Sequence, residues 1–122
     1  MRFITAQGGL YQLYIKLPKP RRIQVGKLGK FYFPKGNYIY TGSAQNGLEG
    51  RIARHAHKYK KLHWHIDYLL KYSKIKEIKK FPGRKAECKL HKDTLVKMKG
   101  GNFIKCFGSS DCGCGGHLGF IE

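Results

Sequence analysis

Residues 38–57 read YIYTGSAQNGLEGRIARHAH, and the fold of the chain can be inferred outward from this stretch. Its tyrosines alternate with Ile39 and Thr41, which is the two-residue period of a β-strand. The alternation stops at Gly42, and a helical pattern runs from Leu48 to about residue 58. The stretch therefore predicts a strand, a short loop and a helix.

The residue types in this stretch suit phosphate chemistry. Arg51 and His55 are four residues apart, so they share one face of the predicted helix. Arginine binds phosphate through two parallel hydrogen bonds, and histidine transfers protons near neutral pH. Tyr40 ends the strand with a hydroxyl, and Gly42 permits close approach of a backbone. Taken alone, the stretch fits either one wall of a phosphate site or a solvated basic helix.

Patterns along the rest of the chain predict the other elements. We expect main strands at 9–17, 23–33, 37–42 and 74–81. The strand at 23–33 is broken at its glycines, which leaves a further short strand near 31–33. Short strands are also expected at 102–107 and 117–121. Helices are expected at 48–58, 63–72 and 84–98. This order predicts an α+β fold in which a small, mainly antiparallel central sheet is flanked by helices.

The length of 122 residues predicts one domain over residues 1–122, with a Gly/Cys-rich segment at about 100–122. No apolar run approaches the roughly 18 residues that cross a bilayer, and the first residues lack the pattern of a secretion signal. We therefore interpret the protein as cytoplasmic. Its four cysteines are not expected to form a disulfide framework in that compartment.

The charge balance predicts a polyanionic partner. Lys and Arg number 25 against 7 Asp and Glu, a formal net charge of +18. Nucleic acid fits better than a membrane surface, because no strongly amphipathic basic helix with bulky apolar anchors is present. A solvated Lys-rich surface is the alternative, although such surfaces normally carry matching Glu. Any carboxylate ligand for a metal must come from seven residues: Glu49, Asp67, Glu77, Glu87, Asp93, Asp111 and Glu122.

A second tyrosine strand adds a family resemblance. Gly9-Leu10-Tyr11 resembles the first half, and Tyr40-Thr41-Gly42 the second half, of the motif of the GIY-YIG nucleases. Residues 43–48 resemble the family's loop into its helix, and Arg51, His55 and Glu87 follow in the family's order. The segments HWHIDYLL and FGSSDCGCGGHL resemble small stand-alone prokaryotic members, so the resemblance covers nearly the whole chain.

The resemblance implies a divalent-metal-dependent endonuclease that acts on DNA, in repair or processing. It implies catalytic roles for Tyr11, Tyr40, Arg51, His55 and Glu87. Glu87 would hold Mg²⁺ or Mn²⁺, ions that prefer oxygen ligands. Tyr11 would act as general base or relay to it, and Arg51 would stabilise the transition state. The implied contacts to nucleic acid are Gly42, Ser43, Arg54, His63, Ser109 and Ser110.

The sequence departs from the family motif at two isoleucine positions, where Leu10 and Thr41 stand instead. The family asparagine has no clear match; Asn102 is one candidate, and residues 109–111 (Ser-Ser-Asp) are the other. His63 and Asp67 share a helix face, which fits either a hydrogen-bonded pair that orients the ring or a packed helix end.

The cysteines are compatible with a zinc site. Cys112, Cys114 and His117, with Cys88 or Cys106, supply four soft ligands, although the spacing is not that of a standard zinc finger. Reduced, partly buried thiols in a Gly-rich turn are the alternative. His91 shares a helix face with Glu87, so His91 is a further candidate for a position near the metal.

Two other functions compete with the nuclease. One is a non-catalytic nucleic-acid-binding module that retains the fold and binds DNA or RNA. The other is a basic structural RNA-binding protein, whose binding would not depend on Mg²⁺. Retention of both Tyr11 and Glu87 favours the nuclease.

Overall fold

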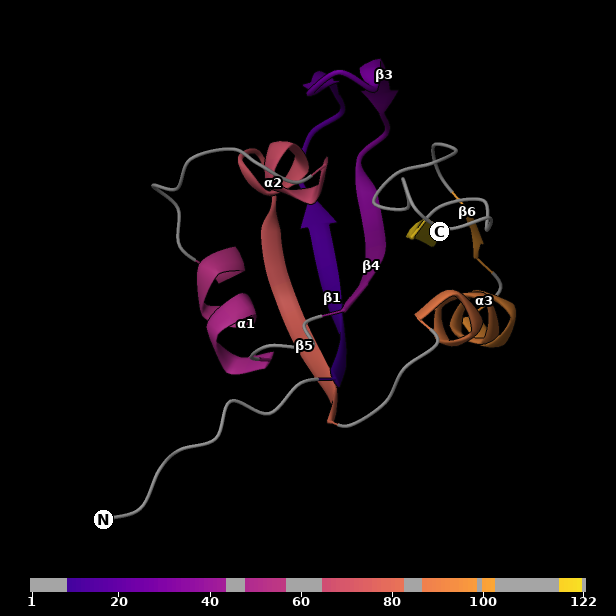
Figure 1. Cartoon of the computed structure of the whole chain (residues 1–122). Coiled ribbons are helices and arrows are strands. Elements are labelled where there is room, and N and C mark those ends of the chain that lie inside the picture. Colours follow the sequence, from indigo (N-terminus) through magenta and orange to yellow (C-terminus); the bar gives the residue numbers. More distant parts are fainter. Residues whose placement is uncertain are drawn as a thin grey trace.

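An antiparallel sheet forms the centre of the chain, and helices cover both of its faces (Figure 1). This computed structural model describes residues 9–43, 48–56, 65–82, 87–98, 100–102 and 117–121. The described elements follow in the order β1 (Gly9–Leu17), β2 (Arg21–Val25), β3 (Gly29–Phe33), β4 (Gly36–Ser43), α1 (Leu48–Ala56), α2 (His65–Leu70), β5 (Lys74–Pro82), α3 (Glu87–Met98), β6 (Gly101–Asn102) and β7 (Leu118–Ile121).

Within the described residues, the strand order of the main sheet is β5-β1-β4-β7-β6. Each neighbouring pair in this sheet is antiparallel. The predicted α+β class with a mainly antiparallel central sheet is therefore confirmed. None of the helices in the described ranges is long and apolar enough to cross a membrane.

The alternation of β1 separates two layers of side chains. Tyr11, Leu13 and Ile15 belong to the hydrophobic core, which also includes residues of α1 and α2. Gln12 points to the opposite face, where its amide donates a 2.9 Å hydrogen bond to Thr94 of α3. Because side chains alternate along a strand, α1 and α3 cover opposite faces of the sheet, as Figure 1 shows.

The strands β2 and β3 form a hairpin outside the main sheet. Gly26 adopts φ +50° at its turn, a left-handed conformation that glycine tolerates best. Ile23, Val25 and Phe33 are buried and join the core beside α2. The glycine break predicted within 23–33 is thus a hairpin turn, and the first strand begins at Arg21.

The end of the second helix also differs from the sequence prediction. The helix expected over 63–72 ends at Leu70. Beyond it, the backbone hydrogen bonds join residues three positions apart, from the N–H of Tyr72 to the carbonyl of Leu69 and from the N–H of Ser73 to the carbonyl of Leu70. The hydroxyl of Ser73 also bonds the Leu69 carbonyl at 2.8 Å. Of the strand expected over 102–107, residues 103–107 lie outside the described residues, and β6 covers Gly101–Asn102.

Candidate active site

The register of β1 and β4 brings the two tyrosine motifs together. Tyr11 lies opposite Gly42, and Leu13 lies opposite Tyr40. The rings of Tyr11 and Tyr40 are consequently diagonal neighbours, with centroids 6.2 Å apart. A Cβ on Gly42 would lie 2.4 Å from both Cζ and Oη of Tyr11. Glycine at this position therefore leaves the space that the Tyr11 phenol occupies.

Helix α1 adds His55 to these tyrosines. The hydroxyl of Tyr11 lies 2.6 Å from Nε2 of His55, a hydrogen-bond distance. The His55 ring also lies beside the rings of Tyr11 (5.3 Å) and Tyr40 (6.2 Å). The relative exposure is 1% for Tyr11, 7% for Tyr40 and 3% for His55. We call these three residues the Tyr-His cluster; it is a buried group in which one short hydrogen bond can carry a proton.

Helix α2 supplies a carboxylate behind the Tyr-His cluster. Asp67 is fully buried, and its Oδ1 lies 3.9 Å from Nδ1 of His55. Arg54 of α1 holds both carboxylate oxygens, at 2.9 and 3.0 Å. This paired geometry satisfies the buried charge of Asp67 and fixes α2 against α1. Arg54, predicted to contact nucleic acid, thus has an internal carboxylate as its observed partner.

Arg51 lies where the loop after β4 begins. Its Nη1 donates a 2.9 Å hydrogen bond to the carbonyl of Ser43, the last residue of β4. The bond holds the guanidinium at the strand end that contains Gly42 and faces Tyr11 across the register. Arg51, Ser43 and the Tyr-His cluster are therefore gathered at one end of the sheet.

Glu87 begins α3, and the backbone brings this helix start near the same end of the sheet. The strand β5 ends at Pro82, which pairs with Gly9, and Lys80 pairs with Tyr11. Only four residues separate Pro82 from Glu87. The Glu87 side chain lies outside what the structure describes. Among the described side chains, no three of His, Cys, Asp and Glu gather into a metal-binding group.

The zinc candidate His117 lies on the other face of the sheet, beneath α3. Its ring is buried 6.1 Å from that of His91, which is also buried. Nδ1 of His91 lies 2.8 Å from Oγ1 of Thr41, and the Gln12 amide donates to the same Oγ1 at 3.2 Å. Sequence reasoning did not identify this polar network, because its members come from distant parts of the chain.

Several predicted residues fall outside the description of the structure. The ranges omit His63, Cys106, Ser109, Ser110, Asp111, Cys112 and Cys114, and the side chains of Glu87, Cys88 and Asn102. The proposed pair of His63 with Asp67 and the cysteine ligands for zinc therefore stay predictions. The contacts of Asp67 in the described ranges include those to Arg54 and His55.

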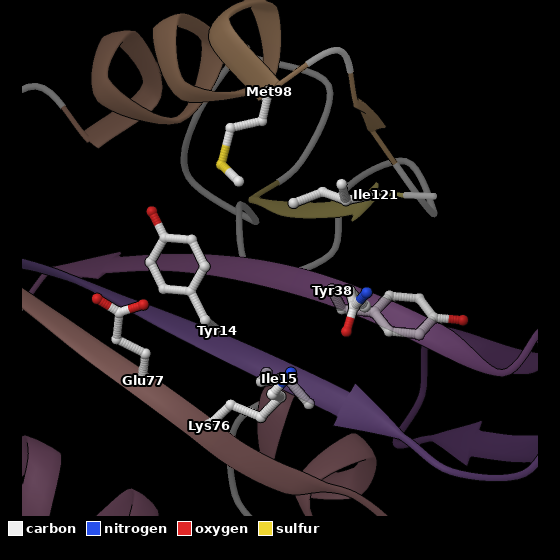
Figure 2. Close-up of a pocket in the computed structure, with 8 residues that line it drawn as sticks. Tyr14, Ile15, Tyr38, Lys76, Glu77, Met98 and Ile121 are labelled. Carbon is white, nitrogen blue, oxygen red and sulfur yellow. The ribbon is translucent and has the colours of Figure 1, made fainter.

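A hollow of about 270 Å³ lies away from the Tyr-His cluster, between the sheet and the end of α3. Figure 2 shows the side chains of Tyr14 and Glu77 pointing across it toward Met98. It lies beneath α3, whereas the Tyr11 phenol points toward α1. We therefore place the candidate active site at the Tyr-His cluster and not at this hollow.

Comparison with known proteins gives a family and no assigned activity. The model of the family described as "Domain of unknown function DUF123" matches residues 10–122. No curated protein and no solved structure matches the chain.

Proposed function

The chain belongs to the DUF123 domain family, and we propose that it is a divalent-metal-dependent endonuclease of GIY-YIG type that hydrolyses phosphodiester bonds in DNA. The observation that carries the proposal is the 2.6 Å contact between the Tyr11 hydroxyl and Nε2 of His55. Gly42 makes room for the phenol, and Arg51 is held at the same end of the sheet. A buried tyrosine hydroxyl needs a hydrogen-bond partner even in a purely structural role, as the bond from Tyr38 to the Pro34 carbonyl illustrates. Support for catalysis comes from the type of partner, an imidazole that can accept the proton, together with an arginine held at the same end of the sheet.

Tyr11 and His55 act as a proton relay in this proposal. The phenol transfers its proton across the 2.6 Å bond to Nε2 of His55, which leaves a phenolate. The phenolate takes a proton from the attacking water, and the resulting hydroxide forms the new P–O bond as the scissile P–O bond breaks. The leaving oxygen takes a proton from solvent. Asp67, 3.9 Å from Nδ1 of His55, stabilises the imidazolium that forms.

In this proposal Arg51 stabilises the negative charge that develops on the phosphoryl oxygens. A guanidinium is permanently charged and offers donors in a planar fork, which suits those oxygens. Its bond to the Ser43 carbonyl fixes its direction before the substrate binds, so little is lost in reorganisation. The formal charge of +18 supports the proposal separately, because it favours binding of a polyanion.

The carboxylate oxygens of Glu87 are suitable ligands for the divalent metal that this chemistry requires. Mg²⁺ is usually bound through one or two carboxylates together with water and substrate phosphate, so a single glutamate at the start of α3 suffices. When bound, the ion would supply Lewis-acid polarisation of the phosphate.

A cleavage panel tests the proposal. Supercoiled plasmid, single-stranded DNA, branched DNA and structured RNA are incubated with Mg²⁺, Mn²⁺ or EDTA. We expect metal-dependent cleavage of DNA that is lost in Glu87→Ala and kept in the control Glu77→Ala, which removes an exposed carboxylate of β5. Binding of DNA should remain in both variants.

The panel also separates the competing functions. Tight binding of nucleic acid without cleavage of any substrate would favour the non-catalytic module. Cleavage of RNA alone would overturn the assignment to DNA. Cleavage that persists in Glu87→Ala would remove Glu87 from the mechanism.

A further inference from the structure

The β2–β3 hairpin is an addition to the sheet that the catalytic proposal does not use. It lies between β1 and β4 in the sequence, but pairs with neither and packs against α2. Tyr11 and Leu17 are six residues apart on β1, so the hairpin begins about 20 Å from the Tyr-His cluster. Figure 1 shows the hairpin at the end of the sheet remote from the start of β1.

One face of the hairpin is apolar and buried, and the other is polar and exposed. On the exposed face, Arg22 lies opposite Tyr32, and Gln24 lies opposite Lys30. The Tyr32 side chain is 53% exposed, which is high for an aromatic residue. A hairpin that served only to extend the core would not need an aromatic ring and two cations on its outer face.

A groove of about 350 Å³ runs between this face and the end of α2. Arg22, Gln24 and Lys30 line it from the hairpin. The opposite side consists of Tyr68 of α2 and of Lys71 and Tyr72 in the turn that follows this helix. The guanidinium of Arg21 stacks over the Tyr72 ring at 3.8 Å, which ties the hairpin to this turn. The groove thus has a fixed wall, cationic edges and aromatic surface.

The charge of this region has one sign. Residues 18–35 contain six basic residues and no acidic residue. In α2, the acidic residue is Asp67, which is fully buried and held by Arg54. No described carboxylate of the hairpin or of α2 therefore offsets the surface formed by Arg22, Gln24, Lys30, Tyr32, Lys71 and Tyr72, which we call the hairpin surface.

We propose that the hairpin surface binds a single-stranded DNA arm of the substrate, about 20 Å from the bond that is cut. This inference rests on the proposed nuclease function. Contact with a duplex backbone requires cations alone, whereas unpaired bases stack on aromatic side chains beside a cationic groove. A single strand whose bases stay stacked at the duplex spacing of about 3.4 Å per nucleotide covers about 20 Å in about six nucleotides, and an extended strand covers it in fewer.

Binding measurements test the inference without requiring cleavage. Fluorescence anisotropy of a labelled 20-nucleotide single strand and of the matching duplex is measured at several salt concentrations, with EDTA present. Arg22→Ala/Lys30→Ala should weaken binding of the single strand about tenfold and lower the salt slope by about 1.4, or 0.7 for each lost phosphate contact. Tyr32→Ala should weaken binding about tenfold and leave the slope unchanged.

A matched control variant removes two positive charges from a surface outside the hairpin. Lys92→Ala/Lys97→Ala takes two exposed cations from α3, and we expect a change in affinity of less than threefold. Thermal melts of all variants establish that the fold is kept, which their exposed positions favour. Equal weakening by the α3 control would overturn the hairpin surface as a specific contact.

The other outcomes are equally decisive. If the duplex loses as much affinity as the single strand, or if RNA of the same sequence binds more tightly than DNA, the assignment to single-stranded DNA is wrong. If the nuclease cuts, truncating the substrate to three nucleotides on either side of the cut should make the hairpin variants and the wild type equally active. If nothing is cut, the nuclease proposal fails while the binding result still stands.

Discussion

The hydroxyl of Tyr11 and Nε2 of His55 lie 2.6 Å apart, with both side chains almost completely buried. The two residues are 44 positions apart in the sequence and come from β1 and α1. At this distance the hydroxyl and the imidazole nitrogen form one buried hydrogen bond, so replacing either residue removes that bond from the other.

Replacing Tyr11 with phenylalanine should abolish cleavage and retain DNA binding. The variant removes the phenolate that accepts the proton of the attacking water in the proposed relay. We expect the single-turnover rate to fall by about 10² to 10⁴. The free energy of unfolding should fall by about 1–3 kcal/mol, because His55 loses a buried partner. Tyr14→Phe is the control, since that hydroxyl bonds Gln12 on the other face of β1. Equal rates in the two variants would remove Tyr11 from the relay.

Gly42→Ala should impair both stability and cleavage. Its Cβ would lie 2.4 Å from the Tyr11 hydroxyl, so the ring must leave its position or the strands must shift. We expect a loss of about 1–3 kcal/mol in urea unfolding and a slower cleavage rate. The control is Gly101→Ala, where an added Cβ would meet nothing within 4 Å. A Gly42→Ala variant as active as Gly101→Ala would show that the phenol position is not required.

Much of the fold is predictable from local patterns. The alternation at Gly9–Leu17, Gly36–Ser43 and Lys74–Pro82 predicts three central strands, and the apolar stripes predict the helices. The strand order could not be predicted in this way, because it depends on pairing between segments that lie far apart. The separate hairpin was likewise hidden, since Arg21–Val25 and Gly29–Phe33 look like interrupted parts of one strand.

The site was predictable to the extent that its residues carry a motif. Tyr11, Tyr40 and His55 were predicted through the resemblance to a family motif, and the three side chains meet in the structure. Asp67 and its partner Arg54 were not paired by sequence reasoning, because their contact spans two helices. A signal was present: Asp67 lies among the apolar residues of α2 in a chain with few acids, and a buried carboxylate requires a cation or hydrogen-bond donors.

Asp67→Asn should destabilise the fold and slow cleavage. The variant leaves the Arg54 guanidinium without its carboxylate, and breaking a buried ion pair costs about 3–5 kcal/mol. The imidazolium of His55 also loses a negative charge 3.9 Å from Nδ1, so the cleavage rate should fall when measured where the variant is fully folded. Asp93→Asn is the control, because the Lys89–Asp93 pair is exposed and should contribute less than about 1 kcal/mol. Similar unfolding free energies for the two variants would contradict a structural role for the Arg54–Asp67 pair.

Tyr38→Phe should make the fold less sensitive to alkaline pH. Burial of the Tyr38 phenol, together with the nearby phenol of Tyr32, raises the pKa of Tyr38 above its usual value near 10. The unfolded chain therefore loses this proton first, so the free energy of unfolding falls as pH rises above about 10. At pH 7 the variant should lose about 1 kcal/mol, because Tyr38 donates a hydrogen bond to the Pro34 carbonyl. Urea unfolding at pH 7, 9.5 and 11 measures both effects, and a constant difference between variant and wild type across these pH values would contradict the raised pKa.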